Sequence, residues 1–141
     1  MERFDRIEWG PEFGIGNQKI DAEHKSLITI HNKLVDFIQQ GKTRKEMAEI
    51  LSELADHSLK HFQTEEQYME KLGYPKTEEH KNLHKEFIYK ISMFNSNLLS
   101  DHPPKPEEII RFLHYWWFEH IQQHDLEYEN FQKQHPEHQS R

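Results

Sequence analysis

Apolar side chains recur every three or four residues in four long segments of this chain, and this spacing limits the possible folds more than any other feature. The segments cover residues 20–38, 47–72, 80–98 and 110–131. Such a repeat places the apolar side chains on one face of an α helix. No segment shows the alternation of polar and apolar residues that is typical of a strand. Four helices that each bury one face predict an all-α, up-down-up-down four-helix bundle.

The breaks between these segments carry residues that end or begin helices. Gly41 and Gly73 follow the first and second apolar runs, and glycine is common just after the last turn of a helix. Thr43 and Glu46 have the spacing of a capping box, and Pro106 suits the first turn of the fourth helix. The pattern predicts one domain over residues 1–141, made of an irregular N-terminal arm (1–17), the bundle (18–133) and a polar tail (134–141).

Composition and charge argue against several functions. The formal net charge is −7, which disfavours nucleic acid because phosphates attract clustered Lys and Arg. No run approaches the roughly 20 apolar residues of a membrane span, and residues 1–10 contain no apolar signal-peptide core. The chain has no cysteine, which excludes disulfides, thiolate metal sites and iron–sulfur clusters. We therefore expect a monomeric, cytoplasmic protein without nucleic-acid or membrane partners.

Polar residues that can bind metals occupy the apolar faces of all four segments. They are His24, His61, Glu65, His80, His84 and His120. A lone histidine on such a face is most often a core residue that hydrogen-bonds to a neighbour. A buried carboxylate without a partner is costly, however, and it normally pairs or binds metal. A bundle would bring these six side chains together, and bundles do use inward histidines and carboxylates to build two-metal sites.

The spacing within two segments supports a metal site. His80 and His84 are four residues apart, as are His61 and Glu65, so each pair projects from one helix face and can reach one ion. A single HxxxH arises often by chance, and the zinc-protease signature HExxH is absent. Imidazole and carboxylate ligands suit iron, zinc, copper or manganese, so the spacing does not name the metal.

Longer motifs carry a family resemblance. WGPEFGIGNQKIDAEHKSLI, HFQTEEQYM, GYPKTEEHKNLH and WWFEHIQQHD follow one another between Trp9 and Tyr128. In residues and spacing they resemble the hemerythrin family, specifically the single-domain bacterial hemerythrins. The resemblance implies a left-handed four-helix bundle around a non-haem di-iron centre with an oxo or hydroxo bridge. It also implies reversible binding of dioxygen, for carriage, storage or sensing.

The resemblance further implies a set of ligands. One iron would be held by His80, His84 and His120. The other would be held by His24 and His61, with one position open for dioxygen. The two irons would be bridged by Glu65 and Asp125. The oxygen pocket would include Ile121 and Trp117, the latter at a position where the family usually has a smaller leucine.

Two points leave alternatives open. Helical periodicity from His120 selects His124, whereas the family motif selects Asp125, which lies about 140° further round an ideal helix than His120. We expect Asp125 to be the ligand because no other carboxylate is a candidate here. We also expect His31 and His57 near the inner face, where they would either pack and hydrogen-bond within the core or handle protons. A di-iron oxidase or peroxidase, or a protein that handles iron or nitric oxide, is the alternative function; the histidine-rich ligands and apolar pocket favour oxygen binding without enzymatic activity.

Overall fold

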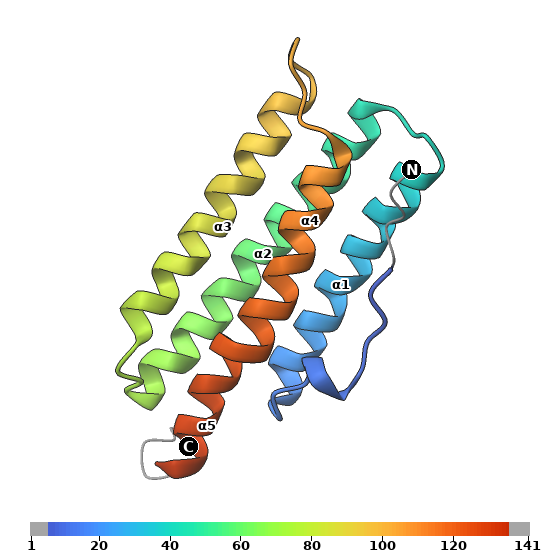
Figure 1. The fold of residues 1–141 in the computed structure, drawn as a ribbon. Helices are drawn as coiled ribbons and strands as arrows, with labels where there is room; N and C mark the ends of the chain where they lie inside the picture. The colour runs from blue at the N-terminus through green and yellow to red at the C-terminus, as the bar shows by residue number, and fades with distance from the viewer. Residues whose placement is uncertain (1–5, 136–141) are drawn as a thin grey trace.

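The computed structural model describes residues 6–135, and this part of the chain is helical without strands. Figure 1 shows the long helices lying side by side, with successive helices running in opposite directions. The elements are η1 (Pro11–Phe13), α1 (Gln18–Gln39), α2 (Arg44–Leu72), α3 (Thr77–Leu98), α4 (Pro106–Trp116), η2 (Trp117–Asp125) and α5 (Leu126–Gln134). The last three follow one another without a break and form one fourth helix (Figure 1). The predicted four-helix bundle is confirmed.

Local side-chain chemistry sets the helix ends. The Thr43 and Glu46 side chains form both bonds of the capping box at the start of α2. Asn17 caps α1, because its side chain accepts a hydrogen bond from the backbone amide of Ile20. Gly41 and Gly73 both adopt a φ of 68°, a left-handed conformation that glycine reaches without the steric cost of a Cβ atom. These helix boundaries therefore follow from short-range signals in the sequence.

The core consists of two apolar clusters with a polar layer between them. The larger cluster runs from Ile7 through Leu54 and Leu113 to Ile121, and the smaller one contains Ile15, Ile20, Met69, Tyr74 and Tyr128. Along α1 the polar layer begins at the first turn after Ile20, and along α2 it ends one turn before Met69. The helix α1, the helix α2 and the fourth helix thus cross from one apolar cluster to the other through a short polar stretch, whereas α3 contributes buried apolar residues only to the larger cluster.

The N-terminal arm is part of this core. Ile7, Phe13 and Ile15 are 4%, 1% and 3% exposed. The amide of Ile7 donates to Asn32 Oδ1, and Asn32 Nδ2 donates back to the carbonyl of Ile7, both at 2.7 Å. The arm was predicted as irregular, and the structure adds the short helix η1 together with this burial. The first five and the last six residues of the predicted arm and tail lie outside the described residues.

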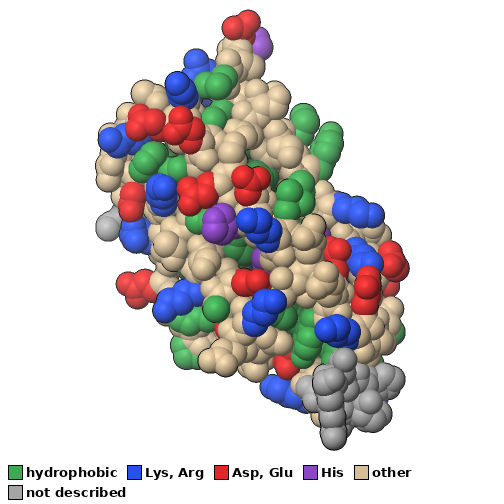
Figure 2. All heavy atoms as spheres, turned by 180° about the vertical axis from the view of Figure 1, so that it is seen from behind, with side chains coloured by type: hydrophobic (Ala, Val, Ile, Leu, Met, Phe, Trp, Pro, Cys, Tyr) green, Lys and Arg blue, Asp and Glu red, His purple; other side chains and the backbone are tan. Residues whose placement is uncertain are grey.

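The surface is strongly charged and mixed in sign. Over the face seen in Figure 2, acidic and basic side chains are interspersed, and apolar side chains appear in small groups between them. Among the described residues, no helix combines the length and the apolar character needed to cross a membrane.

Candidate metal centre

The seven side chains predicted as metal ligands meet in the polar layer at the middle of the bundle. They are His24 from α1, His61 and Glu65 from α2, His80 and His84 from α3, and His120 and Asp125 from η2. None is more than 3% exposed. Their ligand atoms form two overlapping groups, in each of which all atoms lie within 4.8 Å of one another. The two groups share Glu65 and Asp125.

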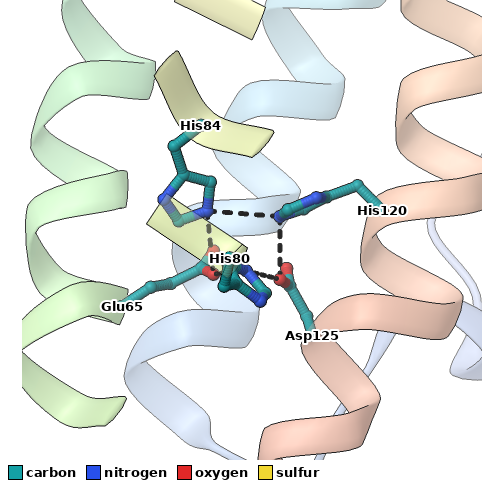
Figure 3. A group of neighbouring side chains, drawn as sticks. All are labelled: Glu65, His80, His84, His120 and Asp125. Atoms are coloured by element: carbon teal, nitrogen blue, oxygen red, sulfur yellow. Dashed lines mark hydrogen bonds and ion pairs between the residues drawn. The ribbon is translucent and has the colours of Figure 1, made fainter. Parts of the chain in front are cut away.

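The first group contains three histidines and is drawn in Figure 3. His84 Nε2 lies 3.2 Å from His120 Nε2, and the Nε2 atoms of His80 and His120 each lie 2.9 Å from Asp125 Oδ1. The three rings and two carboxylates all point toward one small space between the helices (Figure 3). Because every ring presents Nε2 to this space, one cation there could be bound by three imidazoles.

The second group contains two histidines. His24 Nε2 lies 2.9 Å from Asp125 Oδ2 and 3.4 Å from Glu65 Oε1. His61 Nε2 also contacts Glu65 Oε1. A cation here would be bound by two imidazoles, one fewer than in the first group. This difference would leave room for another ligand on that cation.

Each carboxylate turns one oxygen to each group of histidines. Glu65 directs Oε1 to His24 and His61 and Oε2 to His80 and His84. Asp125 directs Oδ2 to His24 and Oδ1 to His80 and His120. Two carboxylates arranged in this way can each bridge a pair of cations.

Several of the buried polar atoms make no well-directed hydrogen bond among the described residues, even where an ion-pair partner lies 2.9 Å away. They include Glu65 Oε2, His80 Nε2 and both carboxylate oxygens of Asp125. Buried polar groups are nearly always hydrogen-bonded, because leaving one unpaired costs free energy. A cluster of unpaired acceptors and imidazoles in a bundle core is therefore best explained by cations that the side chains would bind, and the donor set suits them.

In the absence of metal, the histidines and carboxylates of the cluster shift one another's pKa values. Burial by itself would lower the pKa of His61, but the charge of Glu65 and the hydrogen bond to Glu23 raise it to about 10. Burial would raise the pKa of Glu65, yet the surrounding histidines hold it well below its usual range. The pKa of Asp125 is lowered as well, against burial and the charge of Glu65, by the imidazoles of His120 and His24. Both carboxylates are thus anionic and available to cations.

A stretch of π-helix explains why Asp125 and not His124 enters the cluster. Residues Trp117–Asp125 have π-helical hydrogen bonding, in which each bond spans five residues instead of four. Residues five apart are therefore brought toward the same face, and Asp125 is fully buried beside His120. His124 is only half-buried, and its ring centroid lies 6.4 Å from that of His80. The residue that simple α-helical periodicity selected, His124, therefore lies outside both groups of candidate ligand atoms.

The two further histidines near the inner face have different positions. His31 is completely buried, and its Nδ1 accepts a hydrogen bond of 3.0 Å from Trp117 Nε1. His57 is exposed, so the prediction that it lies near the inner face was wrong. Successive residues of a helix point in different directions, so a shift of one position along the 29-residue helix α2 turns a side chain from the core to solvent.

Two carboxylates that the sequence reasoning missed orient the ligand histidines. His61 Nδ1–H donates to Glu23 at 2.7 Å, and His84 Nδ1–H donates to Glu66 at 2.9 Å. With a cation bound, these bonds would keep the proton on Nδ1 and leave the lone pair of Nε2 for the cation. Glu23 directly precedes His24 and Glu66 directly follows Glu65, so adjacency to a ligand was the only available signal.

Removing the charge of Glu23 should weaken metal binding without removing a ligand. We expect Glu23→Gln to lower iron affinity roughly 10- to 100-fold, the usual range for such supporting groups. Competition with a chelator, followed at the visible absorption of the iron protein, measures the effect. Glu49→Gln, an exposed position on α2, is the control. Equal affinity of the two variants would show that the bond to His61 has no role in metal binding.

Comparisons with known proteins agree with this geometry. The family model of the "Hemerythrin HHE cation binding domain" matches residues 16–130. The bacteriohemerythrin of Pseudomonas aeruginosa is 35% identical over 122 residues, which is 86% of this chain and 78% of that protein. The bacteriohemerythrin of Clostridium acetobutylicum is 36% identical over 125 residues, 85% of this chain and 96% of that protein. A crystal structure of wild-type hemerythrin superposes with a TM-score of 0.80 at 28% identity, covering 88% of this chain and 95% of that one.

Proposed function

The chain belongs to the hemerythrin family, and from this premise we propose that it binds dioxygen reversibly at a non-haem di-iron centre. The observation that supports the proposal most is the bridging arrangement of the two carboxylates. Glu65 and Asp125 each turn separate oxygens to a group of three histidines and to a group of two. The site is therefore built for two cations with unequal numbers of protein ligands.

The ligand assignment follows from these two groups. The iron held by three histidines would use His80, His84 and His120. The iron held by two histidines would use His24 and His61. Glu65 and Asp125 would bridge the pair, together with an oxygen from solvent. The iron pair would supply the two electrons that dioxygen binding requires, and the group with fewer histidines would leave room for dioxygen.

The surroundings of the centre favour binding over turnover. Ile121 and Trp117 are each 1% exposed, and we place them in the oxygen pocket, where apolar side chains withhold water and protons from the bound molecule. Burial lowers the pKa of His31 to about 3, so this imidazole is neutral near pH 7 and carries no additional proton. We therefore propose a binding protein and not a di-iron oxidase or peroxidase.

Metal and oxygen stoichiometry test the function directly. We expect about two irons per chain after expression with ample iron, because the cluster offers two sets of ligands. The reduced protein should take up about one dioxygen per iron pair and release it under vacuum with the ferrous state restored. Elemental analysis and visible absorption measure both quantities. One zinc per chain with no retained iron contradicts the di-iron centre, and rapid multiple turnovers of peroxide with an added reductant would indicate an enzyme.

The size of Trp117 should control access to the open iron. We expect Trp117→Leu to accelerate both azide binding and autoxidation, because a smaller side chain admits ligands and water. Trp117→Phe keeps much of the bulk but loses the hydrogen bond to His31. Comparing it with Trp117→Leu therefore separates the effect of side-chain size from the effect of the hydrogen bond. Stopped-flow absorption measures azide binding, and the decay of the oxygenated spectrum measures autoxidation. Unchanged rates in the leucine variant would mean that the indole packs away from the pocket.

We also propose that the protein works as a monomer in the cytoplasm, as one domain centred on the bundle. The family match over residues 16–130 covers nearly all of the bundle. The net charge of −7 and the mixture of acidic and basic side chains in Figure 2 argue against a nucleic-acid partner. Size-exclusion chromatography with light scattering would measure the mass in solution.

A further inference from the structure

A surface pocket lies between α2 and α3, beside the metal cluster. Its volume is about 410 Å³, within the roughly 300–1,000 Å³ typical of small-molecule sites. Its walls are largely apolar and include Leu59, Phe62, Ile88 and Tyr89. Leu59 is 46% exposed and Tyr89 is 68% exposed, so both side chains are accessible to a molecule that enters the pocket.

The floor of this pocket contains a metal ligand. His84 lines the pocket, while its Nε2 faces the three-histidine group at 3.2 Å from His120 Nε2. Phe62, also in the wall, stacks flat on the His84 ring with centroids 3.8 Å apart and an interplanar angle of 6°. A molecule in the pocket would therefore be separated from the nearer iron by a single imidazole.

The location of the pocket beside one of the two histidine groups matters for how the proposed irons could be reduced. Once a di-iron centre is oxidised to the ferric state, it needs two electrons before it can bind dioxygen again. A donor that approached the open iron would compete with dioxygen for the same space. His84, which lines the pocket, belongs instead to the three-histidine group, so a donor bound there would not occupy the position open to dioxygen.

We propose that this pocket binds a planar aromatic reductant of the hydroquinone class, which reduces the di-iron centre through the His84 imidazole. This inference rests on the proposed function. The hydroquinone breaks its two O–H bonds and becomes a quinone, and its two electrons convert both ferric ions to ferrous ions. The two protons pass to solvent water, and Glu66 remains the acceptor of the hydrogen bond from His84 Nδ1.

The chemistry of the walls selects this ligand class. The aromatic rings of Phe62 and Tyr89 and the aliphatic Leu59 and Ile88 suit a flat ring system. Gln63 and Lys85, also in the wall, can hydrogen-bond to oxygens at its ends. A second pocket, lined in part by Tyr74 and His80, has a volume of about 220 Å³, below the range typical of small-molecule sites. A third, of about 420 Å³ and lined in part by Tyr89 and Phe94, has no candidate metal ligand in its wall. Of these three pockets, the α2–α3 pocket alone combines the size needed for an aromatic donor with a candidate metal ligand.

The test uses the iron-loaded, ferric protein, after elemental analysis and its visible spectrum have confirmed two irons. A protein without iron would contradict the proposed function and is recognised at this step. Reduction by 1,4-naphthohydroquinone is followed anaerobically by stopped-flow absorption. We expect the rate to saturate with hydroquinone concentration, and equilibrium dialysis should show one naphthoquinone bound per chain.

Variants of the pocket wall locate the site. Tyr89→Ala and Leu59→Glu should each raise the half-saturating concentration, and the dissociation constant from dialysis, by about tenfold or more, because apolar contact with the ring is lost. The matched controls are Tyr115→Ala and Leu99→Glu, whose side chains are 65% and 61% exposed on other surfaces. Reduction by dithionite, a small inorganic donor, should be equally fast in all five proteins, including the wild type.

Three results would overturn the proposal. The first is a rate that rises linearly with hydroquinone without saturating. The second is an equal effect of the pocket and control variants, which would place the donor elsewhere or indicate a protein donor. The third is naphthoquinone binding that Tyr89→Ala abolishes while the rate of reduction stays unchanged, because the pocket would then bind quinones without conducting electrons.

Discussion

Replacing Asp125 with alanine should abolish the di-iron centre, whereas replacing His124 should leave it in place. Asp125 is fully buried and supplies one oxygen to each group of histidines. Its loss removes a ligand from both irons and leaves the neighbouring imidazoles without their anionic partner. We expect iron to fall from two per chain to fewer than one, with loss of the visible absorption bands. Elemental analysis and absorption spectra measure this, and circular dichroism confirms that the bundle remains folded.

His124→Ala provides the contrast on the next residue. His124 is half-buried and lies outside both groups of candidate ligands, so its removal should keep both irons. Its ring packs 5.8 Å from that of His120, and a small loss of stability is the expected cost. If iron is lost in His124→Ala and kept in Asp125→Ala, then α-helical periodicity is the better guide and the π-helical assignment of this segment is wrong.

Changing the number of residues in η2 should affect metal binding in one direction only, because an insertion should destroy the site whereas a deletion should be tolerated. A π-helical turn contains one residue more than the α-helical turn it replaces. Deleting Gln123 places Asp125 four residues after His120, on the same face of an ordinary α helix. Gln123 is exposed, and its side chain donates a hydrogen bond of 3.0 Å to Glu119 on the same helical segment. We therefore expect the deletion variant to retain two irons per chain.

Inserting an alanine between Gln122 and Gln123 should instead destroy the site. The insertion separates His120 from Asp125 by six residues, which neither helix type brings onto one face, and it rotates Tyr128 out of the smaller apolar cluster. We expect loss of iron and a marked fall in the thermal unfolding temperature, measured by elemental analysis and calorimetry. If the deletion variant also loses its iron while folded, then the wider π-helical backbone itself, and not the register, is required for the ligand geometry.

Most of the fold was predictable because its signals are local. The capping box of Thr43 and Glu46, the positive φ of Gly41 and Gly73, and Pro106 at the first turn of α4 all act within a few residues. The inward faces follow from periodicity, which also selected six of the seven buried candidate ligands. Asp125 came from the family resemblance alone, since regular periodicity pointed to His124.

The failures share a physical cause, which is that they concern contacts between helices. Glu23 lies on α1 and orients His61 on α2, and no spacing in the chain links these two residues. His31 accepts a hydrogen bond from Trp117, which is 86 residues away in the chain. His57 was also predicted to lie near the inner face, but it is exposed. The pocket between Leu59 and Tyr89 likewise depends on how α2 packs against α3.

The amino-acid order alone therefore determined where the helices begin and end, which faces are buried, and which residue types face the interior. These properties depend on the backbone conformation of a few neighbouring residues and on the period of the helix. The bundle decided which oxygen of each carboxylate faces which histidines, which carboxylates orient the rings, and that nine residues of the fourth helix adopt a π-helical form. Those outcomes require atoms from different helices to be placed within a few ångströms of one another, and only packing in three dimensions does that.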